Sequence, residues 1–186
     1  MTSEDISRTI ARLTYEIIEK NPDLSEVVIV GLVARGDILA HRIAAKIKEI
    51  AGADVPIGKL DITFYRDDIN RKGPSLKAEK TEIPVTITDK TVVLVDDVLY
   101  TGRTIRAAID ALIDHGRPGK IQLAALLDRG HRELPIRPDY VGKNIPTAYN
   151  DRVQLKLKEL DGEDIVLLSG PEANLEANLE DSSEGE

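Results

Sequence analysis

Hydrophobic residues recur along this chain with two different spacings, and these spacings predict its helices and strands. Apolar residues three to four positions apart predict amphipathic helices at 6–20, 38–50 and 105–114, the second of them capped by Gly36 or Asp37. Continuous apolar or β-branched runs predict buried strands at 27–32, 55–64, 91–95 and 121–127. Shorter alternating runs predict further strands at 85–88, 153–158 and 165–168. Strands that alternate with helices indicate an α/β domain with a mostly parallel central sheet flanked by helices.

Three segments follow neither spacing. Residues 65–80 carry charges of both signs, which predicts a loop or a long hairpin. Residues 128–147 contain three prolines, two glycines and many charges, and we expect an ordered surface lobe there rather than core. From 170 onward the chain is acidic and of low complexity, which is typical of a disordered tail. The predicted domain therefore spans 1–169, followed by a tail at 170–186.

Composition excludes several classes of protein. The 186 residues fit one domain, and the absence of cysteine excludes a disulfide framework and a thiolate metal site. The sequence has no signal peptide and no apolar run near the roughly 18–20 residues of a membrane span, so we expect a cytoplasmic protein without membrane contact. The net charge of −8 does not exclude nucleic-acid binding, because six acidic residues lie in 171–186.

The strand predicted at 91–95 runs directly into two carboxylates, Asp96 and Asp97, and then into a short loop that contains Thr101 and Gly102. Adjacent carboxylates at the end of a buried strand repel each other, and this cost favours a role in ligand binding. Backbone N–H groups of such a loop, at the start of a helix, can hold a phosphate. A sugar that carries both hydroxyls and a phosphate satisfies both features. An ordinary strand–turn–helix unit, in which Thr104 caps the helix, is the alternative.

The string VVLVDDVLYTGRT at 92–104 resembles the signature of type I phosphoribosyltransferases, which bind phosphoribosyl pyrophosphate (PRPP). The resemblance implies that Asp96 and Asp97 contact the ribose hydroxyls and that the following loop holds the 5′-phosphate. It also implies that Asp97 acts in catalysis, through a proton on the base. The residues of this PRPP and nucleotide site are Asp96, Asp97, Val98, Leu99, Tyr100, Thr101, Gly102, Arg103 and Thr104.

Two further loops fit the same family. Ala34, Arg35 and Gly36 follow the first core strand, where the family has its pyrophosphate loop, and the Arg35 guanidinium offers several donors to a diphosphate. The string DITFYRDD at 61–68 resembles the start of the flexible loop that closes over PRPP, which implies a catalytic role for Arg66 beside the pyrophosphate. An exposed turn arginine and a loop of solvated charges are the respective alternatives.

The strings DRGHRELPIR at 128–137 and VGKNIPT at 141–147 resemble one subfamily, the bifunctional pyrimidine-operon attenuation regulators and uracil phosphoribosyltransferases. This resemblance implies a hood at about 128–152 over the nucleobase, with Arg129 beside the base and Val153 lining the site. The implied reaction converts uracil and PRPP to UMP and pyrophosphate. The three histidines show no metal-ligand spacing, so no protein metal site is expected, and Mg²⁺ arrives with PRPP.

The same resemblance implies a second activity, which is binding of pyrimidine leader mRNA in response to UMP or UTP, and it implies homodimers or tetramers. The basic residues that match the RNA-binding pattern are Arg12, Lys20, His131, Arg132, Arg137 and Lys143. The chain departs from the pattern at Ala11, Tyr15, Lys20 and Ala34. Two alternatives therefore stay open: an RNA-binding regulator with vestigial catalysis, and a phosphoribosyltransferase for another nucleobase.

Overall fold

The computed structural model describes residues 1–65 and 80–170, and its centre is a sheet of five parallel strands. The strand order is β2-β1-β3-β4-β5. The strands are β1 (Val27–Leu32), β2 (Ile57–Leu60), β3 (Thr91–Leu99), β4 (Lys120–Asp128) and β5 (Tyr140–Asn144). The helices are α1 (Ser3–Lys20), α2 (Arg35–Ala51), α3 (Arg103–Asp114) and the short α4 (Lys158–Asp161), with single 3₁₀ turns η1 (Leu24–Glu26) and η2 (Thr63–Tyr65).

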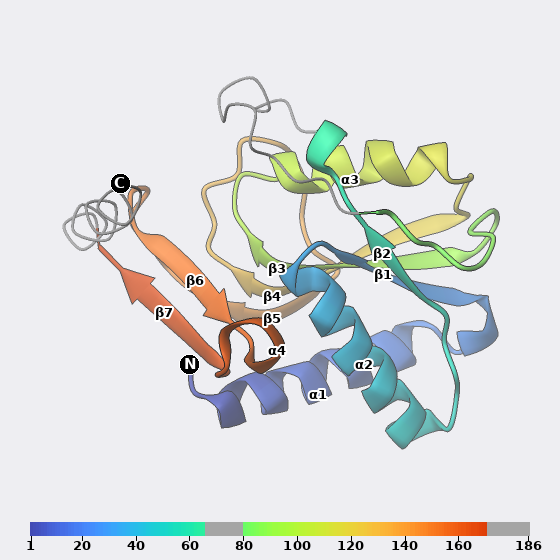
Figure 1. Ribbon diagram of the computed structural model, residues 1–186, viewed down its shortest axis with the longest axis horizontal. Helices are drawn as coiled ribbons and strands as arrows, with labels where there is room; N and C mark the ends of the chain where they lie inside the picture. The colour runs from blue at the N-terminus through green and yellow to red at the C-terminus, as the bar shows by residue number, and fades with distance from the viewer. Residues whose placement is uncertain (66–79, 171–186) are drawn as a thin grey trace, which may run out of the picture.

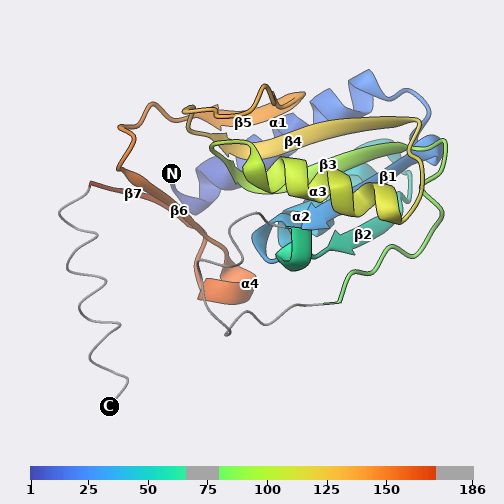
Figure 2. The same cartoon turned by 90° about the horizontal axis from the view of Figure 1, so that it is seen from above.

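Helices cover both faces of this sheet, α1 and α2 on one face and α3 on the other (Figures 1 and 2). All six residues of β1 are buried, as expected for a strand inside a parallel sheet. Its alternate side chains enter two separate cores: Ile29 packs with α1 and α2, whereas Val28 and Val30 pack with α3. The predicted α/β class and mostly parallel sheet are confirmed.

An antiparallel hairpin of β6 (Arg152–Lys156) and β7 (Ile165–Ser169) forms a second sheet that is not hydrogen-bonded to the main one (Figure 1). The main-chain N–H and C=O groups of Val166 pair with those of Met1, each at 3.0 Å, and this attaches the hairpin to the start of α1. The connection between β6 and β7 contains α4 and turns back at Gly162, which has a left-handed φ of 80°. The strands predicted at 153–158 and 165–168 correspond to this hairpin, except that β6 ends at Lys156 and Lys158 already begins α4.

Four sequence predictions need correction. The second helix begins at Arg35 with Ala34 as its N-cap and no side-chain cap, so Asp37 lies in its first turn. The strand predicted at 55–64 is only β2, followed by η2. Residues 85–88 form no strand, and the neighbouring pairing is a single bridge between Glu82 and Lys59. The segment 128–147 is not only a surface lobe, because it contains β5, whose Tyr140 is 2 % exposed.

Residues 66–79 and 171–186 lie outside the described residues, so most of the predicted 65–80 loop and almost all of the predicted tail are not seen. In the part of the chain that the structure describes, no helix is both long and apolar enough to cross a bilayer.

Candidate active site

The two acidic residues of the central motif lie in β3, near its carboxyl end. Asp96 is 7 % exposed, and Asp97 is half-buried. Asp96 Oδ1 accepts the Asp97 N–H at 2.9 Å, and Asp97 Oδ1 accepts the Val98 N–H at 2.8 Å. The main chain therefore fixes both carboxylates at the edge of the sheet where open α/β folds bind ligands. The strand runs on to Leu99, four residues beyond its predicted end.

The loop after β3 leads into the N-terminus of α3. Gly102 is the N-cap residue, with a left-handed φ of 93° and no side-chain cap hydrogen bond. The Thr101 hydroxyl accepts the Arg103 N–H at 3.3 Å, and Thr104 lies in the first helical turn rather than capping it. The helix start therefore keeps N–H donors for an anion, and the helix dipole favours negative charge there.

The turn after β1 lies against β3, directly beside the acidic pair. The peptide bond between Val33 and Ala34 is cis, and Arg35 and Gly36 begin α2. A Cβ atom on Gly36 would lie only 2.5 Å from the Val95 carbonyl oxygen, so this position requires glycine. The structure thus brings the turn at 34–36, the acidic residues and the start of α3 to one edge of the sheet.

Arg129 follows β4 at the same edge and lies in an aromatic environment. Its guanidinium lies 4.1 Å from the centre of the Tyr100 ring and donates to the carbonyls of Ala148 and Tyr149 at 3.1 and 3.3 Å. The residue is 9 % exposed, and its buried Nε has no hydrogen-bond partner in the structure. The rings of Tyr100, His131 and Tyr149 pack edge to face or tilted, with centroids 5.7–6.0 Å apart. A planar ligand with a hydrogen-bond acceptor suits this cluster.

Comparison with known proteins decides the family. The family model of the phosphoribosyl transferase domain, which describes the sequences of that family, matches residues 2–160. The chain belongs to the phosphoribosyltransferase family. It is 54 % identical over 174 residues to a "Bifunctional protein PyrR" of Chloroflexus aurantiacus, covering 94 % of this chain and 96 % of the relative. It is also 54 % identical over 172 residues to a protein of the same name from Deinococcus radiodurans, covering 92 % and 94 %.

The fold agrees with this family. A solved structure of Trypanosoma cruzi hypoxanthine phosphoribosyl transferase superposes with a TM-score of 0.72 over 96 % of this chain and 93 % of its own, at 18 % identity. At that identity the likeness shows the fold alone. The resemblance noted in the sequence, both to the phosphoribosyltransferases and to the bifunctional subfamily, is confirmed by these matches.

The remaining predicted site residues of this phosphoribosyltransferase come from other parts of the chain. Val153 lies on β6, which packs against β3, and is half-buried against the core shared with α1 and α2. Asp61 follows β2, where its Oδ1 accepts the Thr63 N–H at 2.7 Å. Arg66 lies outside the described residues.

The predicted RNA-binding residues divide into two groups. Four are engaged within the protein: Arg12 donates to the Val141 and Gly142 carbonyls, Lys20 to Asp139, Arg132 to Asp128 and the Tyr100 carbonyl, and the ring of His131 bonds to the Thr147 carbonyl. The other two, Arg137 and Lys143, are exposed and make no ion pair within 1–65 and 80–170. Arg137 lines a cavity of about 490 Å³ together with Arg129 and Arg132.

No group of three or more His, Asp or Glu side chains in the described ranges has the arrangement of a metal site. Sequence reasoning did not find several contacts of the site residues. The largest omission is Asp161, which binds Arg35 from 126 positions away at 2.9 Å. The carbonyls of Ala148 and Tyr149 that hold Arg129 were also missed, because no local pattern in the sequence marks either partner.

Proposed function

We propose that this phosphoribosyltransferase transfers the phosphoribosyl group of PRPP to uracil, which yields UMP and diphosphate. The observation that carries the proposal is the meeting of Asp96–Asp97, the α3 N-terminus and the turn at 34–36 at one sheet edge. Carboxylates accept hydrogen bonds from the hydroxyls of a sugar, and the N–H groups at the α3 N-terminus and the turn at 34–36 suit a 5′-phosphate and a diphosphate. The relatives named bifunctional, at 54 % identity, favour uracil as the base.

Each end of PRPP has its own partners in this proposal. Asp96 and Asp97 accept hydrogen bonds from the ribose hydroxyls. The 5′-phosphate sits on the amides of 100–104, and the diphosphate sits on the turn at 34–36 and on Arg35. Arg129 and Val153 adjoin the base. The reaction needs no covalent nucleophile, because the protein orients two reactants and stabilises charge on the sugar and the leaving group.

Magnesium fits this site as an ion carried by the substrate. Carboxylate oxygens are available at Asp97, but the described residues hold no cluster of three acidic or histidine ligands. Oxygens of the diphosphate and water would therefore complete the coordination shell, as Mg²⁺ prefers. When bound, the ion neutralises charge on the leaving diphosphate.

The second proposed activity is binding of leader RNA in response to uridine nucleotides, and Arg137 and Lys143 are its main phosphate contacts. The Arg137 guanidinium and the Lys143 ammonium are exposed and make no ion pair with the described residues. Binding of an RNA phosphate therefore breaks no ion pair within that part of the protein. The relatives' printed name, "Bifunctional", favours a second activity. We propose residues 1–169 as the catalytic domain and 170–186 as a tail that catalysis does not need.

Labelled uracil tests the enzymatic proposal. The protein with PRPP and Mg²⁺ should form labelled UMP, and uracil should outcompete hypoxanthine and orotate. Asp97→Asn should lower kcat/KM by about 10- to 100-fold, the value of one or two hydrogen bonds to a charged group, with little change in the melting temperature. Preference for another base would assign this domain to a different substrate, and a collapse of the melting temperature would make Asp97 a structural carboxylate.

A gel-shift titration of leader RNA, with and without UMP, tests the regulatory proposal. Binding should tighten with UMP and weaken as salt rises. Binding that ignores UMP would refute the regulatory mechanism without affecting the enzymatic one.

A further inference from the structure

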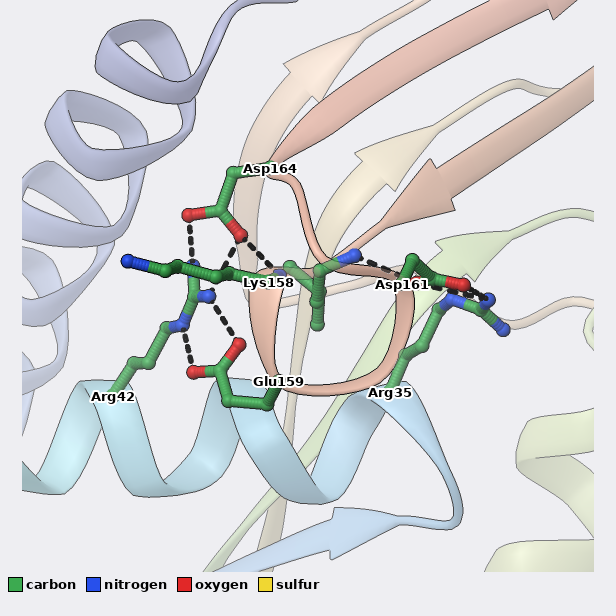
Figure 3. Close-up of polar contacts among 7 residues, drawn as sticks. Arg35, Arg42, Lys158, Glu159, Asp161 and Asp164 are labelled. Atoms are coloured by element: carbon green, nitrogen blue, oxygen red, sulfur yellow. Dashed lines mark hydrogen bonds and ion pairs between the residues drawn. The ribbon is translucent and has the colours of Figure 1, made fainter.

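Two arginines of α2 bind acidic side chains of the β6–β7 connection (Figure 3). Arg42 donates to both oxygens of Glu159, at 2.9 and 2.5 Å, and to both oxygens of Asp164, at 3.0 and 2.7 Å. Arg35 donates through Nη2 to both oxygens of Asp161, at 2.9 and 3.2 Å. The two arginines thus bind the same segment, but only Arg35 belongs to the turn at 34–36.

Main-chain hydrogen bonds hold Asp161 in place. Its Oδ2 accepts the Leu157 N–H at 2.8 Å, and its own N–H donates to the Leu157 carbonyl at 2.7 Å. The left-handed Gly162 then turns the chain toward β7. The carboxylate is therefore fixed before it meets Arg35, so the ion pair orients a long side chain with little further loss of entropy.

Asp161 leaves part of the Arg35 guanidinium unused. Both of its contacts go to Nη2, whereas Nε is buried and has no hydrogen-bond partner in the structure. A buried N–H without an acceptor is unfavourable, and the described protein offers it none. The buried Nε is closed to a ligand, but the Arg35 side chain is 29 % exposed and its Nη1 makes no hydrogen bond to the described residues. An anion at the turn can accept from Nη1, and guanidinium groups bind phosphate oxygens well.

We propose that Asp161 is a positioning residue for diphosphate recognition: it holds Arg35 so that the unused guanidinium donors face the diphosphate of PRPP. The inference rests on the proposed function of the turn at 34–36. It makes the β6–β7 connection part of PRPP binding, although Asp161 itself does not touch the substrate. Arg42 attaches the same segment to α2 through two other carboxylates, but it is not part of the turn at 34–36.

The test compares Asp161→Asn with Glu159→Gln, a matched change two residues earlier in α4 that removes an ion pair to Arg42 only. Asparagine keeps an oxygen that can accept the Leu157 N–H. Asp161→Asn should raise KM for PRPP about 10-fold and leave kcat and KM for uracil within about 2-fold. The reason is that Arg35 loses its orientation, and with it one charge-assisted hydrogen bond to the diphosphate. Glu159→Gln should change none of these constants by more than about 2-fold.

A double-mutant cycle shows whether Asp161 acts through Arg35. In an Arg35→Ala background, Asp161→Asn should have no further effect on KM for PRPP. An effect that adds fully to that of Arg35→Ala, or an effect equal to that of Glu159→Gln, would overturn the proposal. Melting temperatures of all variants identify any that fail to fold. If Asp161→Asn does not fold, Asp161→Glu takes its place; because it keeps the carboxylate, it should raise KM for PRPP by less than the roughly 10-fold expected for Asp161→Asn.

Calorimetric binding of inorganic diphosphate, with Mg²⁺, separates this inference from the proposed function. If the intact protein shows no transfer to uracil but binds diphosphate, and Asp161→Asn weakens that binding about 10-fold, the uracil assignment fails and the positioning role stands. If uracil is converted and Asp161→Asn binds diphosphate as the unaltered protein does, the positioning role fails alone.

Discussion

Replacing Gly36 by alanine should disable the proposed active site more than it destabilises the fold. The added Cβ would lie 2.5 Å from the Val95 carbonyl oxygen, in the strand that carries Asp96 and Asp97. Restoring an ordinary van der Waals separation requires the start of α2 to move by about 1 Å. Overpacking of this kind costs about 1–3 kcal/mol.

The kinetic effect follows from where this movement occurs. Gly36 lies in the turn that we propose binds diphosphate, so a shift moves the leaving group relative to the acidic residues. Misplacement of reacting groups by 1 Å can cost about 100-fold in rate. We therefore expect kcat/KM for PRPP to fall about 100-fold in the uracil assay, while the melting temperature falls by about 4–8 °C for a loss near 2 kcal/mol.

Gly52→Ala is the matched control at the other end of α2. Gly52 has a left-handed φ of 70°, and an added Cβ would meet nothing within 4 Å. Its cost is backbone strain of about 1–2 kcal/mol, far from the sheet edge, so stability should fall while kcat/KM stays unchanged. Wild-type kcat/KM in a folded Gly36→Ala protein, or an equal loss in Gly52→Ala, would refute the reasoning.

The remaining predictions concern stability, RNA binding and the C-terminal end of the chain. Hydrogen bonds from Arg42 are the main cause that lowers the pKa of Glu159 and of Asp164. A lowered folded-state pKa stabilises above the unfolded value and is lost as pH falls. Arg42→Ala should therefore cost about 1–2 kcal/mol at pH 7. Urea unfolding at decreasing pH should show this difference shrinking below the ordinary pKa values of Glu and Asp side chains, about 4.3 and 3.9; a constant difference would contradict the assignment. Lys143→Ala should weaken RNA binding and reduce the salt slope by about 1, with uracil turnover unchanged, because Lys143 lies outside the cavity that Arg129 lines; equal loss of both activities would contradict separate surfaces. Removal of 171–186 should leave the melting temperature and turnover intact, and an inactive or insoluble product would place that segment in the domain.

Several elements of the fold could be predicted because their cause is local. The strand at 27–32 and the helix at 105–114 are set by the spacing of neighbouring apolar residues, and the structure places β1 and α3 there to within two residues. The fifth strand escaped prediction because its neighbours are charged and proline-rich. Only pairing with β4 and the burial of Tyr140 beneath α1 make that segment part of the sheet.

By itself, the sequence determined that a strand is followed by an acidic pair, then by a glycine loop and then by the start of a helix. These features lie within thirteen consecutive residues, 92–104. That order is sufficient to identify a site for a phosphorylated sugar and the family that uses it. Only the tertiary structure decided which distant groups complete the site. Arg35 meets Asp161, and Arg129 meets the Tyr149 carbonyl, because packing of the β6–β7 hairpin and its flanking loop brings them together. Contacts across such separations depend on how whole elements pack, and no local spacing of residues encodes them.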